Sequence, residues 1–86
     1  MYKGLNLKGF HYDNNMIEDM GQVYFIRDDN EDDSIAIFPD VEDDERSVLV
    51  FYVGCQVRFV TTFVNEVEHA GIENYINDRI SKYFKD

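Results

Sequence analysis

Between Gln22 and Val64 the chain alternates between short apolar segments and polar connections of only a few residues. The apolar segments are rich in β-branched and aromatic side chains, which is typical of β-strands. Parallel neighbours need a crossover of roughly a dozen residues or more, and these connections are shorter. The pattern therefore predicts an antiparallel meander, in which each strand pairs with the next one along the chain.

We expect strands at Leu5–Tyr12 with a bulge at Gly9, Gln22–Arg27, Ser34–Phe38 ending at Pro39, Ser47–Val53, and Val57–Val64. Ser47–Val53 is the most hydrophobic of these segments, which indicates the central strand. Gly54–Gln56 is a tight connection between the last two strands. The capping-box spacing of Asn15 and Glu18 predicts a single helical turn over Met16–Met20.

The end of the chain has helical periodicity. One apolar stripe at i, i+3, i+4 spacing contains Ile72, Tyr75, Ile76, Ile80, Tyr83 and Phe84. Asn65 can cap this helix, with Glu68 three residues on, but Gly71 equally supports a start near that glycine. The stripe is the only cover that we expect for one face of the sheet. The predicted fold is α+β: an antiparallel β-meander of four to five strands with one C-terminal helix packed on one face.

Length and charge restrict the function further. The 86 residues indicate a single domain, 1–86, and the 44% hydrophobic content argues against intrinsic disorder. The net charge of −10 opposes direct binding to nucleic acid or to anionic membranes. The single cysteine, Cys55, favours a reducing, cytoplasmic location, and no apolar run approaches the roughly 20 residues that cross a bilayer.

A metal site is not expected. Asp28, Asn30 and Asp32 match positions 1, 3 and 5 of a calcium loop, but Asp33 replaces its glycine and Pro39 its final glutamate. The three soft ligands, His11, His69 and Cys55, lack the spacing of a zinc site.

An enzymatic function is not expected either, and no cofactor or catalytic residue is predicted. Cys55 could pair with a histidine, but a cysteine between two apolar strands is more often a small, buried or half-buried apolar residue. Catalytic carboxylates need a concave, partly buried pocket, for which a sheet and one helix leave little room.

Acidity is the strongest remaining signal, because ten carboxylates lie in the eighteen residues from Asp28 to Glu45. They fall in two predicted turns, Asp28–Asp33 and Asp40–Arg46, at opposite ends of the strand between them. A strand length of about 17–20 Å would separate the turns. Acids at both ends could imitate the phosphate rows of a duplex; alternatively, the charge only solvates the turns.

Several predicted strands are apolar on both faces, and one helix cannot cover both. The uncovered face, with residues such as Tyr24 and Tyr52, indicates a homodimer or a protein partner. An immunity-type or structural oligomerising protein that binds through this face is therefore the alternative function.

A resemblance adds one expectation. The segments that carry it are Asp33–Asp40, Tyr52–Gln56, Ala70 and Asn74–Tyr75. Together they resemble a family of small phage-encoded proteins of unknown function, over roughly the second half of the chain. That family shows an apolar-Ala-apolar-Phe-Pro-acid segment, then Tyr-x-His-x-Gly-Gln-His-Ser, then a glutamate-tyrosine helix. Gly54 and Val57 stand where the histidines would fall, and Cys55 interrupts the Gly-Gln pair. The resemblance implies a bacteriophage or mobile-element origin and no activity.

The function that we expect is that of a small non-enzymatic inhibitor, a DNA mimic of the anti-defence or anti-CRISPR type, acting in the host cytoplasm. Its partner would be a protein with a basic surface that normally binds nucleic acid. The contacts are expected from Asp28, Asp29, Glu31, Asp32, Asp33, Glu42, Asp43, Asp44 and Glu45.

Overall fold

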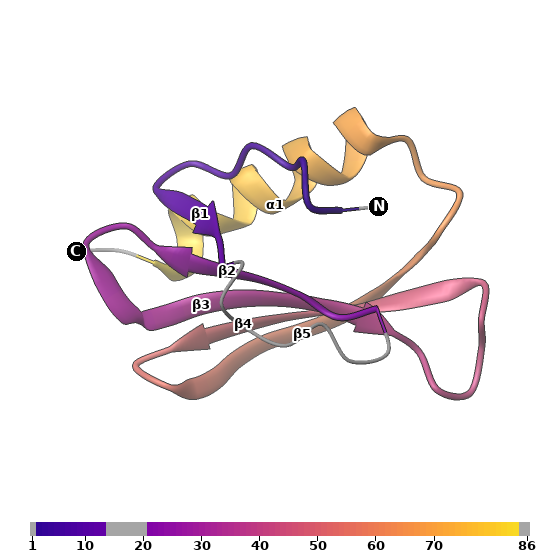
Figure 1. Ribbon diagram of the computed structural model, residues 1–86, viewed down its shortest axis with the longest axis horizontal. Coiled ribbons are helices and arrows are strands. Elements are labelled where there is room, and N and C mark those ends of the chain that lie inside the picture. Colours follow the sequence, from indigo (N-terminus) through magenta and orange to yellow (C-terminus); the bar gives the residue numbers. More distant parts are fainter. Residues whose placement is uncertain (1, 14–20, 85–86) are drawn as a thin grey trace.

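A computed structural model describes residues 2–13 and 21–84 and contains a five-stranded antiparallel sheet with one helix across one face (Figure 1). The elements are β1 (Phe10–Tyr12), β2 (Val23–Arg27), β3 (Asn30–Pro39), β4 (Arg46–Val53), β5 (Gln56–Val64) and α1 (His69–Tyr83). The strand order β1-β2-β3-β4-β5 follows the sequence, so the predicted α+β meander is confirmed. The helical turn expected over Met16–Met20, with its cap at Asn15, lies outside the described residues.

The centre of the sheet is β3 and not the predicted Ser47–Val53, which belongs to its neighbour β4. The reason is the order of the meander, in which β1 and β2 lie on one side of β3 and β4 and β5 on the other. β3 is also longer than predicted and begins at Asn30. Arg27 on β2 pairs with Asn30, so the connection between β2 and β3 is only the pair Asp28–Asp29. The polar half of the predicted turn is therefore strand, because a protruding strand end can keep polar side chains in water.

The N-terminal segment is not a strand over its whole predicted length, since only Phe10–Tyr12 pairs with β2. Gly9 has a φ of +80°, a left-handed conformation that glycine adopts without steric cost, and it turns the chain into β1. Leu5 and Leu7 are nevertheless buried. The segment before Gly9 thus lies beside α1 as a second cover of the sheet (Figure 1).

Side chains of α1 hold this segment by its backbone. The Asn6 N–H donates to Glu73 Oε1 at 2.6 Å, and the Lys8 N–H donates to Asn77 Oδ1 at 2.7 Å. Asn77 Nδ2 in turn donates to the Asn6 carbonyl at 3.0 Å. The prediction that the helix alone covers the sheet was therefore wrong, because the polar edge of α1 supplies partners for an extended strap.

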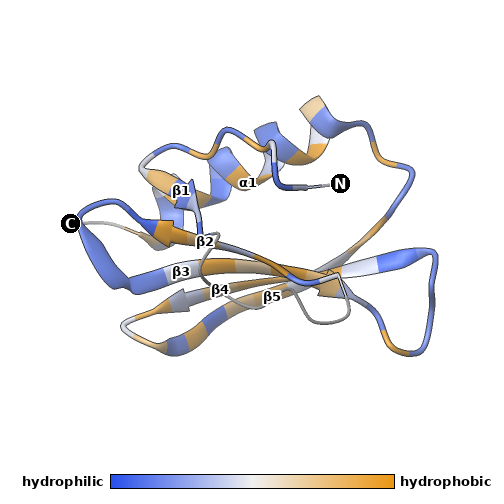
Figure 2. Cartoon of the chain, in the orientation of Figure 1, coloured by the Kyte–Doolittle hydropathy of each residue, from blue (hydrophilic) through white to orange (hydrophobic). Residues whose placement is uncertain are grey.

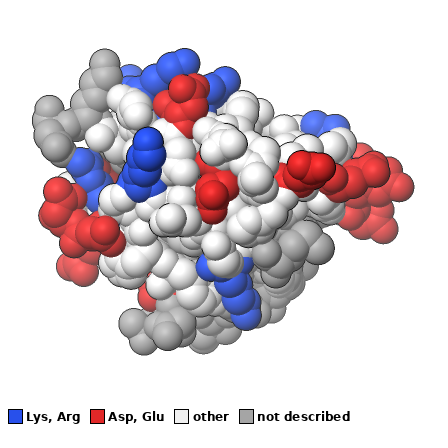
Figure 3. All heavy atoms as spheres, turned by 90° about the horizontal axis from the view of Figure 1, so that it is seen from above, with Lys and Arg blue, Asp and Glu red and all other residues white. Residues whose placement is uncertain are grey.

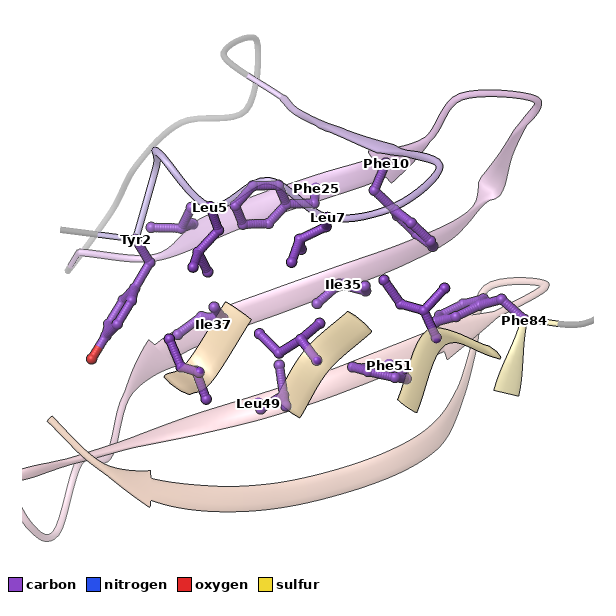
Figure 4. Close-up of a cluster of buried hydrophobic side chains, with 14 residues drawn as sticks. Tyr2, Leu5, Leu7, Phe10, Phe25, Ile35, Ile37, Leu49, Phe51 and Phe84 are labelled. Carbon is purple, nitrogen blue, oxygen red and sulfur yellow. The ribbon is translucent and has the colours of Figure 1, made fainter. Parts of the chain in front are cut away.

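The core lies between the sheet and these two covers (Figure 4). Phe25, Ile35, Ile37, Leu49 and Phe51 come from the sheet, and Ile72, Ile76, Ile80 and Phe84 confirm the predicted helical stripe. Figure 2 shows the apolar residues concentrated along the strands and the polar residues at the hairpin turns. The ring centroid of Phe51 lies 5.1 Å from that of Phe84 and 5.4 Å from that of Phe59, so aromatic contacts join β4 to both β5 and the end of α1.

The helix begins at His69, between the two predicted starts, and Glu68 is its N-cap residue without a side-chain cap bond. Asn65 is not the cap. Its side chain is used in the turn between β3 and β4 instead, as described below.

Candidate acidic interface

The predicted acidic residues form two groups at the two ends of β3. We define the first acidic cluster as Asp28, Asp29, Glu31 and Asp32, all exposed. The second acidic cluster comprises Asp40, Glu42, Asp43, Asp44 and Glu45, of which Asp40 is half-buried and the others are exposed. Asp40 was not among the predicted contact residues, although its place after Pro39 in the same acidic run could have indicated it.

Asp33 does not belong to this surface, although the sequence predicted a partner contact there. Its side chain is only 5% exposed and lies 2.8 Å from Arg27 Nη1. Its other oxygen accepts the Gly54 N–H at 2.8 Å. Asp33 therefore has a structural role: it joins β2, β3 and the turn between β4 and β5.

Arg27 partly neutralises the first acidic cluster, and the His11 ring is hydrogen-bonded to it. Arg27 Nε lies 3.0 Å from Asp29, and His11 Nδ1 lies 2.6 Å from Asp28. Asn30 closes the turn by accepting the Asp32 N–H at 3.1 Å. Within the described residues, Asp29 is thus the member of the first cluster that pairs with an arginine, and Asp28, Glu31 and Asp32 have no lysine or arginine partner.

The second acidic cluster has a rigid backbone. Asp40 Oδ1 accepts the Glu42 N–H at 2.9 Å, and Asp43 Oδ1 accepts the Glu45 N–H at 3.0 Å. Such side-chain-to-backbone bonds close Asx turns, which hold a loop in one conformation. Asp40 and Asp43 therefore restrain the backbone at Glu42 and Glu45.

Asn65 fastens this turn to the end of β5. Its Nδ2 donates to the Asp44 carbonyl at 3.0 Å, and its backbone N–H donates to the Glu45 carbonyl at 2.8 Å. Its Oδ1 accepts the Ser47 hydroxyl at 2.5 Å. A residue that looked like a helix cap is in fact the anchor of the second cluster, which sequence spacing alone could not distinguish.

No lysine or arginine within residues 2–13 and 21–84 forms an ion pair with the second acidic cluster. The nearest arginine in sequence, Arg46, donates from Nη2 to the Thr62 hydroxyl at 2.8 Å. The cluster therefore places five like-charged side chains close together without a lysine or arginine partner among these residues. Such an arrangement opposes folding by self-repulsion and produces a strongly negative local potential.

The two clusters do not form one continuous surface. Figure 3, seen from the helix side, shows acidic side chains gathered at both ends of the long axis, with uncharged, basic and a few isolated acidic residues between them. Asp32 and Asp40 are eight positions apart on an extended strand, which is about 26 Å at the usual rise per residue. The protein thus presents two separate negative ends.

Cys55 is exposed, not buried as expected, and forms the turn after β4 with Gly54. Its Sγ lies 3.7 Å from Asp32 Oδ1. Desolvation, the negative charges of Asp32 and Asp33, and the bond to Asp32 raise the pKa of the Cys55 thiol above its ordinary value. This environment favours an unreactive thiol.

The described part of the chain, 2–13 and 21–84, contains no group of three or more His, Cys, Asp and Glu side chains arranged to hold a metal ion. In the segment that resembles a calcium loop, the Asn30 side-chain oxygen accepts a hydrogen bond from the Asp32 N–H. Among the same residues, no helix is both long and apolar enough to cross a bilayer.

Comparison with known proteins gives no further assignment. Family models, curated proteins and solved structures were compared with this chain, and none matches it.

Proposed function

We propose that this protein inhibits a nucleic-acid-binding protein by placing its acidic ends on that protein's basic surface. A duplex presents about one negative charge per 1.7 Å of its axis, and proteins that bind it carry lysine and arginine at matching positions. A protein of net charge −10 with two acidic ends can occupy such positions without being nucleic acid. The resemblance to phage-encoded proteins favours a bacterial host protein as the target.

The observation that carries this proposal is the second acidic cluster: a turn closed by two Asx bonds, without a cationic partner among the described residues. Solubility does not require a fixed geometry, whereas a binding surface loses less entropy when it is ordered beforehand. Asp40 and Asp43 supply this order, and Glu42, Asp44 and Glu45 present the charge. The first acidic cluster supports the contact with less free charge.

The test is a pull-down from a bacterial lysate with three immobilised forms of the chain. The first is the unaltered protein. The second carries Glu42→Gln, Asp44→Asn and Glu45→Gln, which remove charge but keep both Asx turns. The third carries Glu66→Gln, Glu68→Gln and Asp78→Asn, a matched control that removes the same charge elsewhere on the exposed surface.

We expect the unaltered protein and the control to retain a nucleic-acid-binding protein at low salt and to release it near 0.5 M salt, where screening is effective within a few ångströms. The second form should retain little of it. Equal retention by all three forms, or a complex that survives molar salt, would show that the proposal is wrong.

The outer face of the sheet, opposite α1, favours a second candidate function as a protein-docking module. Tyr24, Phe38, Val48 and Tyr52 are half-buried there, and none of the described elements covers them. In that case Tyr52→Ala would abolish retention and neutralisation of the acidic turns would not.

A further inference from the structure

The two edges of the sheet differ greatly in length. β1 has three residues, whereas β5 has nine and pairs only with β4 among the described elements. A long edge strand exposes unpaired N–H and C=O groups that can pair with another strand. Of the two sheet edges in the described residues, the β5 edge therefore has more open backbone hydrogen-bonding capacity.

The pairing with β4 shows which residues face outward. Just after β5, the Asn65 N–H points to the side of β4 and donates to the carbonyl of Glu45, the residue before β4. Because backbone groups alternate in direction along a strand, those of Phe63 and Thr61 also point to β4. Those of Val60, Thr62 and Val64 point away from the sheet. Within residues 2–13 and 21–84, only the Val64 carbonyl among them has a partner, the Val67 N–H at 3.2 Å.

This edge has little protection against pairing. From Phe59 to Val64 the strand contains no charged residue and no proline, the features that usually block edge-to-edge contact. Val57 and Val60 are 60% and 54% exposed. In a chain with 30% charged residues, a neutral, β-branched and exposed edge indicates a contact surface.

We propose that two copies of the chain associate by antiparallel pairing of their β5 strands, so that one sheet continues across both copies. The contact is isologous and closes after two copies, because the same strand serves both partners. A register centred on Thr61 or Thr62 lets the free groups of Val60 and Thr62 pair with those of the second copy.

Charge complementarity supports these registers. Arg58 is the only charged residue of β5, and the first charged residue after the strand is Glu66. Centring on Thr61 or Thr62 brings Arg58 of one copy alongside the segment from Val64 to Glu66 of the other, twice in a symmetric pair. A hollow of about 260 Å³ lies beside Thr61 and is lined also by Phe63, Ile72 and Tyr75. In the paired sheet, this hollow would receive side chains from the helix-covered face of the second copy.

Sedimentation equilibrium of the full chain under reducing conditions tests the association. A single strand edge lies at the small end of specific interfaces, which begin near 1,200 Å², so concentrations up to about 1 mM are needed. We expect dimer formation to increase between 50 mM and 0.5 M salt, because screening weakens the repulsion between two chains of charge −10. This salt dependence is opposite to that of the proposed acidic contact, so the two proposals fail separately.

The matched variants are Val60→Lys on the free edge and Ser81→Lys on the exposed side of α1. Val60→Lys should weaken dimerisation at least tenfold at unchanged circular dichroism, and Ser81→Lys should leave it unchanged. A protein that stays monomeric at 1 mM in 0.5 M salt, or a Val60→Lys variant that dimerises like the unaltered chain, would overturn the proposal.

Cross-linking tests the register. In a Cys55→Ser background, Thr62→Cys or Thr61→Cys should form an intermolecular disulfide under mild oxidation, since directly opposed Cα atoms lie about 4.5–5.5 Å apart in either case. Ser81→Cys is the control for random collision. If both β5 variants form the disulfide no faster than Ser81→Cys does, pairing along β5 is contradicted.

Discussion

Arg27 Nη1 lies 2.8 Å from Asp33 Oδ2, and the two side chains are only 13% and 5% exposed. This ion pair gives Asp33 a structural role, whereas the acidic residues on either side of it in the sequence are part of the exposed surface. Asp32, the adjacent residue, points into water and belongs to the first acidic cluster. Neighbours with the same side chain thus serve different purposes, because alternate residues of a strand face opposite sides.

The ion pair predicts a large difference between two substitutions. Asp33→Ala leaves Arg27 without its buried partner and the Gly54 N–H without an acceptor, and we expect it to lower the free energy of unfolding by about 3 kcal/mol. Asp32→Ala, the matched control, should change it by less than about 0.5 kcal/mol. Urea denaturation measures both, and equal effects would contradict the structural role of Asp33.

The strap before Gly9 predicts a similar contrast on α1. Asn77→Ala removes both of the side-chain bonds to Asn6 and Lys8 and should cost about 1–2 kcal/mol. Asn74→Ala, on an exposed position of the same helix, should be neutral or slightly stabilising, because alanine has the higher helix propensity. Thermal unfolding compares the two; a neutral Asn77→Ala would mean that the strap contributes nothing to stability.

The turn after β4 contains backbone strain at Cys55, whose φ is +67°. A residue with a Cβ pays about 1–2 kcal/mol in this left-handed region, and glycine does not. We therefore expect Cys55→Gly to raise the free energy of unfolding by about 1 kcal/mol despite the greater freedom of glycine in the unfolded chain. Cys55→Ala keeps the strain and should be near neutral, so a Gly variant no more stable than the Ala variant would argue against strain.

The Cys55 thiol should react slowly with iodoacetamide at pH 7. Its raised pKa reduces the thiolate fraction at neutral pH, and the rate should increase only at a higher pH than for an unperturbed thiol. Asp32→Asn removes a charge that opposes ionisation, so its alkylation profile should move to lower pH. Glu31→Gln, the exposed neighbour, should leave the profile unchanged. A profile insensitive to Asp32→Asn would exclude this carboxylate as a cause.

The fold could be predicted well from the sequence because its determinants are local. Short connections require antiparallel neighbours, and the stripe from Ile72 to Phe84 has one helical period. The strap could not be predicted, because Leu5 and Leu7 alternate like a strand and their cover depends on Asn77, which lies far away in sequence. The first residues of β3, from Asn30 to Asp33, are likewise polar, and their sequence predicts a turn.

The candidate site was predicted only in part. Local composition located the two acidic clusters, since turns concentrate polar residues. Three other features depend on contacts between segments that are separated in sequence. Asp33 pairs with Arg27, Asn65 binds the backbone of the second acidic cluster, and Arg46 donates to Thr62 and not to that cluster. No pattern within one segment contains that information, so the residues that decide which charges stay free could not be identified from the sequence.

Displacement of DNA tests whether this protein inhibits a nucleic-acid-binding protein. The captured host protein is bound to a fluorescent duplex at low salt, and anisotropy is followed while this chain is added. We expect the unaltered protein to release the duplex. The form with Glu42→Gln, Asp44→Asn and Glu45→Gln should need a concentration at least tenfold higher to do so. Equal displacement by both forms, or a stable ternary complex with DNA, would contradict the proposed inhibition.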